Sequence, residues 1–246
     1  MDKAALAQAR LERAQIVRTA GGVNEALASG ALPRRVDLTL SEAIVLGLVR
    51  QGVRTFIGVF GHGSTEIGEV LRIYEQAGVV KSFGVRNETE ATHAASALRW
   101  LKNEKACVFT SIGPGALNAL AGSLVAASNG LGVWFLLGDE TTEDEGPNMQ
   151  QIPKAEQALY LNLCATMGRA YTLHTPLALP TALRRGLNTV DHRYQAGPFF
   201  LLLPMNVQPA PLQGFNLDEL PVGAPPRLGP AADDGAYARA AQAILA

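Results

Sequence analysis

Residues 79–118 read VVKSFGVRNETEATHAASALRWLKNEKACVFTSIGPGALN, and this stretch decides the fold class. Two short runs rich in β-branched and aromatic residues, 79–85 and 106–111, are typical of strands. Between them, residues 88–101 have the composition and spacing of a helix, and a glycine-rich turn after the second run opens a small-residue helix over 115–128. Strands that alternate with helices in this way predict parallel strand pairing.

The same alternation continues on both sides of this stretch. Strand 54–60 (RTFIGVF) precedes a helix over 65–77, and the fully apolar strand 132–137 (GVWFLL) is followed, after a helix around 176–189, by strand 198–203 (PFFLLL). Strands this apolar are covered on both faces. The sequence therefore predicts an α/β fold with an open parallel sheet of five or six strands and helices on both faces.

The chain divides into three predicted segments. Residues 1–36 are expected to form an N-terminal helical extension, residues 37–208 the α/β domain, and residues 209–246 a linker with a terminal helix. The prolines and glycines over 205–231 favour an extended conformation. Residues 233–245 are amphipathic and predict the terminal helix.

Two helix starts carry capping signals. Thr39-Leu-Ser-Glu42 is a capping-box pattern, in which the threonine oxygen and the glutamate carboxylate can satisfy each other's backbone amides. Asn87 is a suitable N-cap for the helix over 88–101, with Glu90 three positions later. A further helix is predicted over 2–19, before a Gly-Gly break.

Composition excludes several classes of protein. The chain has 246 residues with 48% hydrophobic content, and its 21 Lys+Arg and 22 Asp+Glu give a formal net charge of -1, with no basic run suited to nucleic acid. No apolar run reaches the roughly 18 to 20 residues of a membrane span. Cys107 and Cys164 are far apart in apolar segments, so we expect buried, reduced thiols and a cytoplasmic location.

Three loops leave strands and enter helices, where open parallel sheets bind ligands. They are 60–65 (FGHGST), 86–88 (RNE) and 110–118 (TSIGPGALN). A dinucleotide motif beginning at Gly61 would need glycine where Glu66 stands, and no G-K-[ST] follows any glycine loop. On their own, these glycines are equally explained as tight turns.

Taken together, the motifs are more specific. VFGHG at 59–63, RNETEATHAA at 86–95 and TSIGPGALN at 110–118, in this order and spacing, resemble the pyrimidine (PYR) domain of the acetolactate synthase/pyruvate oxidase superfamily of thiamine-diphosphate enzymes. The FGHG turn, the RNE triplet and the isoleucine of TSIGPG are most similar to trihydroxycyclohexanedione hydrolases. Gly138-Asp139, the MQQ at 149–151 and the PMNVQ that ends at 208 continue the likeness, which covers about residues 38 to 208.

The resemblance implies that Glu88 is the catalytic glutamate, which exchanges a proton with a ring nitrogen of the cofactor's aminopyrimidine. Without the flanking motifs, Glu88 is better explained as an acid at a helix start, and the motifs reverse that preference. The resemblance also assigns cofactor contacts to the glycine loops, at Gly61, His62, Gly63, Gly113, Pro114, Gly115 and Asn118. Contacts with substrate are assigned, more weakly, to His62, Gln150 and Gln151.

The relatives hold Mg²⁺ and the diphosphate through a G-D-G motif that this sequence lacks. The resemblance therefore implies that a diphosphate-binding partner subunit holds both, that this chain supplies no metal ligand, and that PYR domains form a dimer or a heterotetramer. The chain is then one subunit of a split enzyme or a truncated product.

The implied reaction is on a C–C bond next to a carbonyl, as in cyclic 1,2-dione hydrolysis. A 2-oxoacid decarboxylase or acyloin-forming subunit, a non-catalytic scaffold and a Rossmann-type dehydrogenase remain as alternatives.

Overall fold

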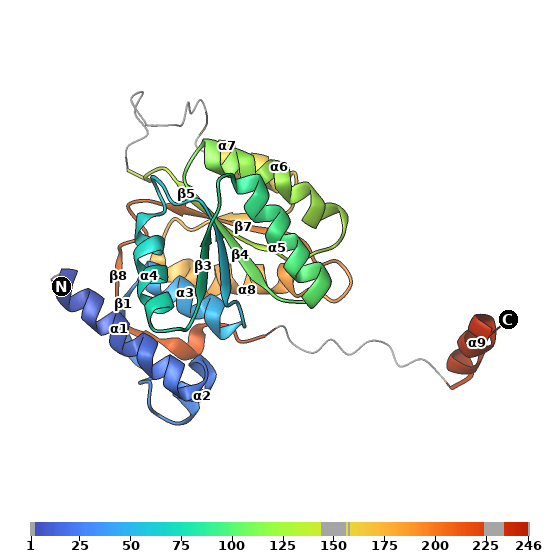
Figure 1. The fold of residues 1–246 in the computed structure, drawn as a ribbon, viewed down its shortest axis with the longest axis horizontal. Coiled ribbons are helices and arrows are strands. Elements are labelled where there is room, and N and C mark those ends of the chain that lie inside the picture. Colours follow the sequence, from blue (N-terminus) through green and yellow to red (C-terminus); the bar gives the residue numbers. More distant parts are fainter. Residues whose placement is uncertain (1–2, 144–155, 157, 224–233, 246) are drawn as a thin grey trace.

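The centre of the fold is a six-stranded, all-parallel sheet (Figure 1). The structure is a computed structural model that describes residues 3–143, 156, 158–223 and 234–245. From one edge to the other, the strands are β3 (Lys81–Gly84), β2 (Thr55–Gly58), β4 (Ala106–Thr110), β5 (Trp134–Asp139), β7 (Phe199–Pro204) and β6 (Arg169–Thr172). This architecture confirms the predicted α/β class with a parallel sheet.

Helices cover both faces of the sheet (Figure 1). One face carries α5 (Glu88–Lys102), α6 (Pro114–Ser128) and α7 (Leu159–Ala165), and the other carries α3 (Leu40–Arg50), α4 (Thr65–Gln76), the short η1 (Pro176–Ala178) and α8 (Leu179–Val190). Successive residues of a strand point to opposite faces. Along β4, Cys107 and Phe109 belong to the core under α3, α4 and α8, whereas Val108 belongs to the core under α5, α6 and α7.

A second, two-stranded sheet and two helices come from the ends of the main domain. β1 (Arg35–Thr39) pairs antiparallel with β8 (Pro211–Asn216), which continues into η2 (Leu217–Glu219). The N-terminal helices α1 (Lys3–Ala20) and α2 (Val23–Ala28) pack against α4 and α3, respectively, below the sheet in Figure 1. The last helix, α9 (Asp234–Leu245), stands apart from this body in Figure 1 and buries none of its described side chains.

The tail is the main place where the structure departs from the sequence-based expectation. An extended linker was predicted over 205–231, but residues 211–216 form β8, and Leu212 and Leu217 are buried in the core. Pro211 is tolerated because it is the first residue of the strand. The pairing joins residues about 180 positions apart in the sequence, so no local pattern signals it. Strand β6 and the short helices α2 and α7 were also not assigned from the sequence.

Helix α1 is held to the main domain by a buried ionic network. Arg13 donates to both carboxylate oxygens of Glu42, from Nε at 2.7 Å and from Nη2 at 2.8 Å. The Tyr74 hydroxyl donates to Glu42 at 3.1 Å, and Arg10 donates to the Thr39 hydroxyl at 2.8 Å. Thr39 caps α3 as predicted by accepting from the Glu42 amide at 3.4 Å. The Glu42 side chain, however, binds Arg13 and Tyr74 instead of closing the capping box.

Both cysteines are buried free thiols, as expected from the sequence. Burial raises the pKa of Cys107 far above its ordinary value. Burial, and secondarily the charge of Asp139, raises the pKa of Cys164 to about 12. In the part of the chain that the structure describes, no helix combines the length and apolarity needed to cross a membrane.

Candidate cofactor-binding site

The strand order places a topological switch point between the carboxyl ends of β2 and β4. From β2 the chain runs through α4 to β3 on one side, and it then returns through α5 to β4 on the other side of β2. Helix α4, which follows β2, and helix α6, which follows β4, pack on opposite faces of the sheet. Open α/β sheets bind ligands at such a switch point.

Two glycine loops meet at this switch point. The amide of Ile112 donates to the carbonyl of His62 at 3.0 Å, which joins the loop after β2 to the loop after β4. Gly63 has a φ of +82°, and a Cβ there would stand 2.3 Å from Cγ2 of Ile112. A Cβ at Gly61 would stand 2.8 Å from Cβ of Ser111. Because any side chain at either glycine would separate the loops, glycine is required for this close approach.

A buried glutamine also holds the loop after β2 in place. Gln208, which follows β7, donates from Nε2 to the carbonyl of Gly63 at 2.7 Å and to the carbonyl of Leu203 at 2.9 Å. Gly138, near the end of β5, lies against the same loop, because a Cβ there would come 2.8 Å from the oxygen of Gly63. Gly138 at the end of β5 and Gln208 after β7 therefore hold the loop after β2 in place at the carboxyl edge of the sheet.

Glu88 lies buried where this edge meets the start of α5. Its side chain is 6% exposed, and its Oε2 accepts a hydrogen bond at 3.0 Å from Nδ2 of Asn118, on α6. The other oxygen, Oε1, would be only 2.8 Å from a Cβ at Gly115. Asn87 caps α5 as predicted, accepting from the Thr89 amide at 2.7 Å. The positive end of the α5 dipole therefore faces the carboxylate.

Comparison with known protein families identifies this arrangement. Residues 38–159 match the family model described as "Thiamine pyrophosphate enzyme, N-terminal TPP binding domain". This chain carries the N-terminal domain of the thiamine pyrophosphate enzymes. The matched range includes both glycine loops and Glu88, and it confirms the family that the sequence motifs resemble.

The chain is also similar to bacterial enzymes of known name. It is 27% identical over 203 residues to the 3D-(3,5/4)-trihydroxycyclohexane-1,2-dione hydrolase of Bacillus licheniformis, covering 76% of this chain and 31% of that protein. It is 28% identical over 193 residues to the enzyme of the same name from Bacillus thuringiensis, covering 70% of this chain and 29% of that protein. This chain therefore spans about a third of the length of these relatives.

Within the thiamine pyrophosphate enzyme domain, most of the predicted contact residues come together. Gly113 (φ +61°) turns the chain out of β4, Pro114 is the first residue of α6, and Gly115 and Asn118 lie beside Glu88. His62 is exposed on the loop after β2, and its backbone, not its side chain, makes the contact with Ile112. Gln150 and Gln151 lie outside the described residues.

A group of buried polar residues after β5 was not predicted from the sequence. Asp139 and Glu140 are 6% and 3% exposed, and Oδ1 of Asp139 accepts from the Glu140 amide at 2.9 Å. Burial, followed by the charges of Asp139 and Glu140, raises the pKa of Tyr160 on α7. The sequence did contain a signal for this group, since Asp139 and Glu140 come one residue after the apolar run 132–137.

The residues at the edge fit the aminopyrimidine half of thiamine diphosphate. Glu88 is buried with Oε2 hydrogen-bonded to Asn118, and among the described residues no hydrogen bond occupies Oε1, which can therefore share a proton with a ring nitrogen. The absence of a side chain at Gly115 leaves space beside that oxygen. Among the described residues, no group of three or more His, Cys, Asp and Glu side chains is arranged to hold a metal ion.

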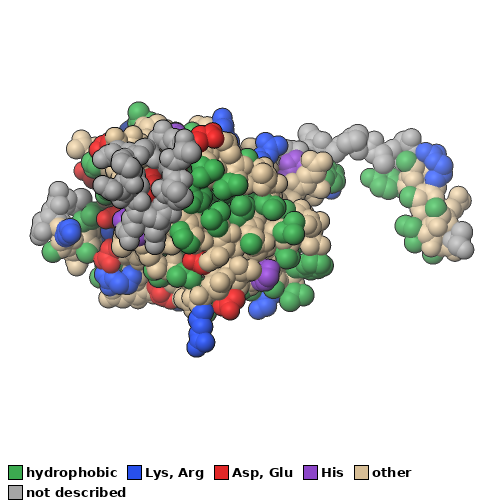
Figure 2. Space-filling view, turned by 90° about the horizontal axis from the view of Figure 1, so that it is seen from above, with side chains coloured by type: hydrophobic (Ala, Val, Ile, Leu, Met, Phe, Trp, Pro, Cys, Tyr) green, Lys and Arg blue, Asp and Glu red, His purple; other side chains and the backbone are tan. Residues whose placement is uncertain are grey.

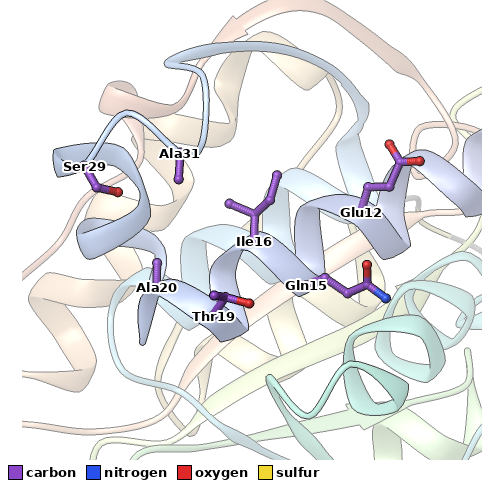
Figure 3. A pocket seen from close by; sticks show the side chains of 7 residues that line it. All are labelled: Glu12, Gln15, Ile16, Thr19, Ala20, Ser29 and Ala31. Atoms are coloured by element: carbon purple, nitrogen blue, oxygen red, sulfur yellow. The ribbon is translucent and has the colours of Figure 1, made fainter.

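One hollow of the described surface lies away from Glu88. A largely apolar cavity of about 660 Å³ opens between α1 and the segment that follows α2, with Ile16 and Ala31 on its walls (Figure 3). Its one charged lining residue is Glu12. Neither glycine loop contributes to this cavity, so its size does not make it the site of the family's chemistry.

Proposed function

We propose that this chain supplies the pyrimidine-binding carboxylate of a thiamine-diphosphate-dependent enzyme that acts on a C–C bond next to a carbonyl. The observation that carries the proposal is the burial of Glu88 at the first turn of α5, hydrogen-bonded to Asn118 and beside Gly115. The similarity to trihydroxycyclohexanedione hydrolases supports a cyclic 1,2-dione as the substrate class.

In this proposal, Glu88 holds and returns a single proton. Bound thiamine diphosphate supplies an aminopyrimidine nitrogen that takes up that proton and a thiazolium ring that reacts with the substrate carbonyl. Asn118 fixes one carboxylate oxygen of Glu88 and leaves Oε1 to face the ring nitrogen. The glycines of the loops after β2 and β4 add no side chains at the switch point, so that a flat ring can approach the backbone.

We further propose that a second, diphosphate-binding chain holds the diphosphate and Mg²⁺ and contacts α5 and α6. The support is a set of exposed apolar side chains on these two helices: Leu117 and Leu124 on α6, which are 44% and 54% exposed, and Trp100 and Leu101 at the end of α5. Hydrophobic side chains gather on the side of the body where these helices lie (Figure 2). Apolar patches of this kind mark interaction surfaces, and Leu117 adjoins Asn118, the residue that binds Glu88.

The decisive test compares Glu88→Gln with Glu90→Gln in a complex reconstituted with the diphosphate-binding chain, thiamine diphosphate and Mg²⁺. Glu90 lies on the same helical turn and is exposed, so it is a matched control. We expect Glu88→Gln to lose roughly 10²- to 10⁴-fold in turnover of a cyclic 1,2-dione, as for removal of a general acid–base group. Glu90→Gln should keep the activity of the unmodified chain.

Each alternative function predicts a different result. Turnover of 2-oxoacids alone would indicate a decarboxylase or acyloin-forming enzyme. Turnover that Glu88→Gln leaves unchanged would indicate a scaffold subunit, and tight binding of NAD by the isolated chain would indicate a dehydrogenase. For the proposed interface, Leu124→Asp should prevent complex formation in size-exclusion chromatography, whereas Leu177→Asp, at an 87% exposed position on η1, should not.

A further inference from the structure

A small polar cavity lies at the amino edge of the sheet, opposite the edge that carries Glu88. Its volume is about 70 Å³. Four segments bound it: the end of α1, the turn from α1 to α2, the residue that precedes β2, and the residues that precede β3. Its lining includes Arg18, Gly21, Gly22, Arg54, Gly78 and Val79.

Arg54 brings an incompletely satisfied cation to this cavity. Its Nη1 is buried and has no hydrogen-bond partner among the described residues. Burial lowers the pKa of Arg54, and the carboxylate of Glu25 only partly opposes that effect. A buried donor without a partner is costly and rare in native proteins, and an ion or water commonly explains it.

Arg18 adds a second guanidinium to the same cavity. Its Nε would lie 3.4 Å from a Cβ at Gly78, which places it over the turn that leads to β3. Among the described residues, neither Arg18 nor Arg54 has a carboxylate within 4.0 Å, unlike Arg13, which pairs with Glu42. Two guanidinium groups without close carboxylates form a site for an oxyanion, because their planar forks match its oxygens.

Glycines keep the cavity open and its backbone accessible. Gly21 and Gly78 have φ values of +88° and +74°, which other residues rarely adopt. A Cβ at Gly22 would come 2.2 Å from Oε2 of Glu25. One water needs roughly 10–15 Å³ of such space, so a cavity of about 70 Å³ has room for an ion with several oxygens.

We propose that this cavity binds a small tetrahedral oxyanion, either inorganic phosphate or the phosphate group of a monoester. The bound ion would join Arg18 of the N-terminal extension to Arg54 of the sheet. The four residues of β2, at about 3.3 Å per residue, separate Arg54 from the loop that carries His62. The site is therefore distinct from the proposed cofactor site and would remain if the proposed function were wrong.

The test is to titrate the full chain with inorganic phosphate in an isothermal titration calorimeter, and to measure its thermal unfolding with and without phosphate. Chloride keeps the ionic strength constant in both experiments. We expect one binding site per chain and, at about one hundred times Kd, a rise in Tm of about 5 °C or more. Arg54→Gln and Arg18→Gln should each weaken phosphate binding at least tenfold. Arg184→Gln removes a similar charge from the exposed side of α8 and should leave binding unchanged.

A parallel titration with glycerol 2-phosphate distinguishes the two sources of the ligand. Binding of both compounds supports a site open to monoesters, and binding of inorganic phosphate alone supports a site closed around the free ion. Phosphate that binds no better than chloride would overturn the proposal, as would binding that persists in both arginine variants. If Arg54→Gln does not fold, Arg18→Gln decides, because the Arg18 side chain is exposed and its loss leaves the core intact.

Discussion

Replacing Gly115 with alanine should separate the stability of the fold from the proposed function of Glu88. The added Cβ would stand 2.7 Å from Oγ of Ser111 and 2.8 Å from Oε1 of Glu88. Both atoms are ends of side chains and not backbone, so they can move while the sheet and helices stay in place. The carboxylate must retreat by about 0.6 Å to reach ordinary contact at 3.4 Å.

The substitution should change the free energy of unfolding only slightly, because the higher helix propensity of alanine partly offsets the cost of overpacking. Its effect on turnover should be much larger. Alanine gains up to about 1 kcal/mol over glycine in a helix, and overpacking costs about 1–3 kcal/mol. The free energy of unfolding should therefore fall by no more than about 2 kcal/mol. A displacement approaching 1 Å at a reacting group can cost about 10²-fold in rate, so Gly115→Ala should lower turnover in the reconstituted complex by about 10- to 100-fold.

Urea unfolding of the isolated chain and steady-state turnover of the complex measure these two effects separately. Gly197→Ala is the matched control, since a Cβ there meets nothing within 4 Å and the position lies before the amino end of β7. It should change neither quantity appreciably. The reasoning is refuted if Gly115→Ala folds with full activity, or if it loses activity only in proportion to a loss of folded protein.

Three further substitutions and one chemical probe test other parts of the structure. Glu42→Gln should reduce the free energy of unfolding by about 3–5 kcal/mol in urea denaturation, because it leaves buried arginines without their anion. Burial raises the pKa of Tyr74 well above 10, so the unfolded state loses that proton first. Deprotonation of Tyr74 in the unfolded state should therefore lower the free energy of unfolding by up to about 1.4 kcal/mol per pH unit above pH 10, and Tyr74→Phe should show a correspondingly shallower fall over that range. Gln208→Leu should lower the unfolding free energy by about 1–3 kcal/mol and speed proteolysis at the loop after β2, since two buried carbonyls lose their donor. With its pKa at about 12, the Cys164 thiol should resist iodoacetamide at pH 8 until urea unfolds the chain, and rapid native labelling would contradict its burial.

The core of the fold was predictable because its signals are local. Strands such as 132–137 are apolar along their whole length, and the junctions at Thr39 and Asn87 carry caps that the structure retains. Strand β8 was missed because its partner lies at the other end of the domain, and its proline and glycine resemble those of a linker. Strand β6 has the burial of an edge strand, without the apolar run that identified the others.

The candidate site was predictable in its residues and not in its contacts. The motifs named Glu88, Gly115 and Asn118 together, but only the folded chain brings Nδ2 of Asn118 to the carboxylate across two helices. Nothing in the sequence near Gln208 signals that its amide fixes a loop 145 residues earlier. Side-chain contacts of this kind depend on strand order, which spacing along the sequence does not specify.

Glu42 and Glu88 show why a buried acid at a helix start cannot be interpreted from its sequence position alone. Both lie in the first turn of a helix behind a capping residue, and both are buried. Glu42 accepts from Arg13 through both oxygens and also from Tyr74, so its charge is compensated and its oxygens are occupied. Among the described residues, Glu88 forms no ion pair and accepts from the neutral amide of Asn118 through one oxygen. A fully paired carboxylate stabilises the fold, whereas one with a single neutral partner retains an oxygen that can exchange a proton with a ligand. If Glu88→Gln were to lower the free energy of unfolding as much as Glu42→Gln does, this distinction between the two acids would be wrong.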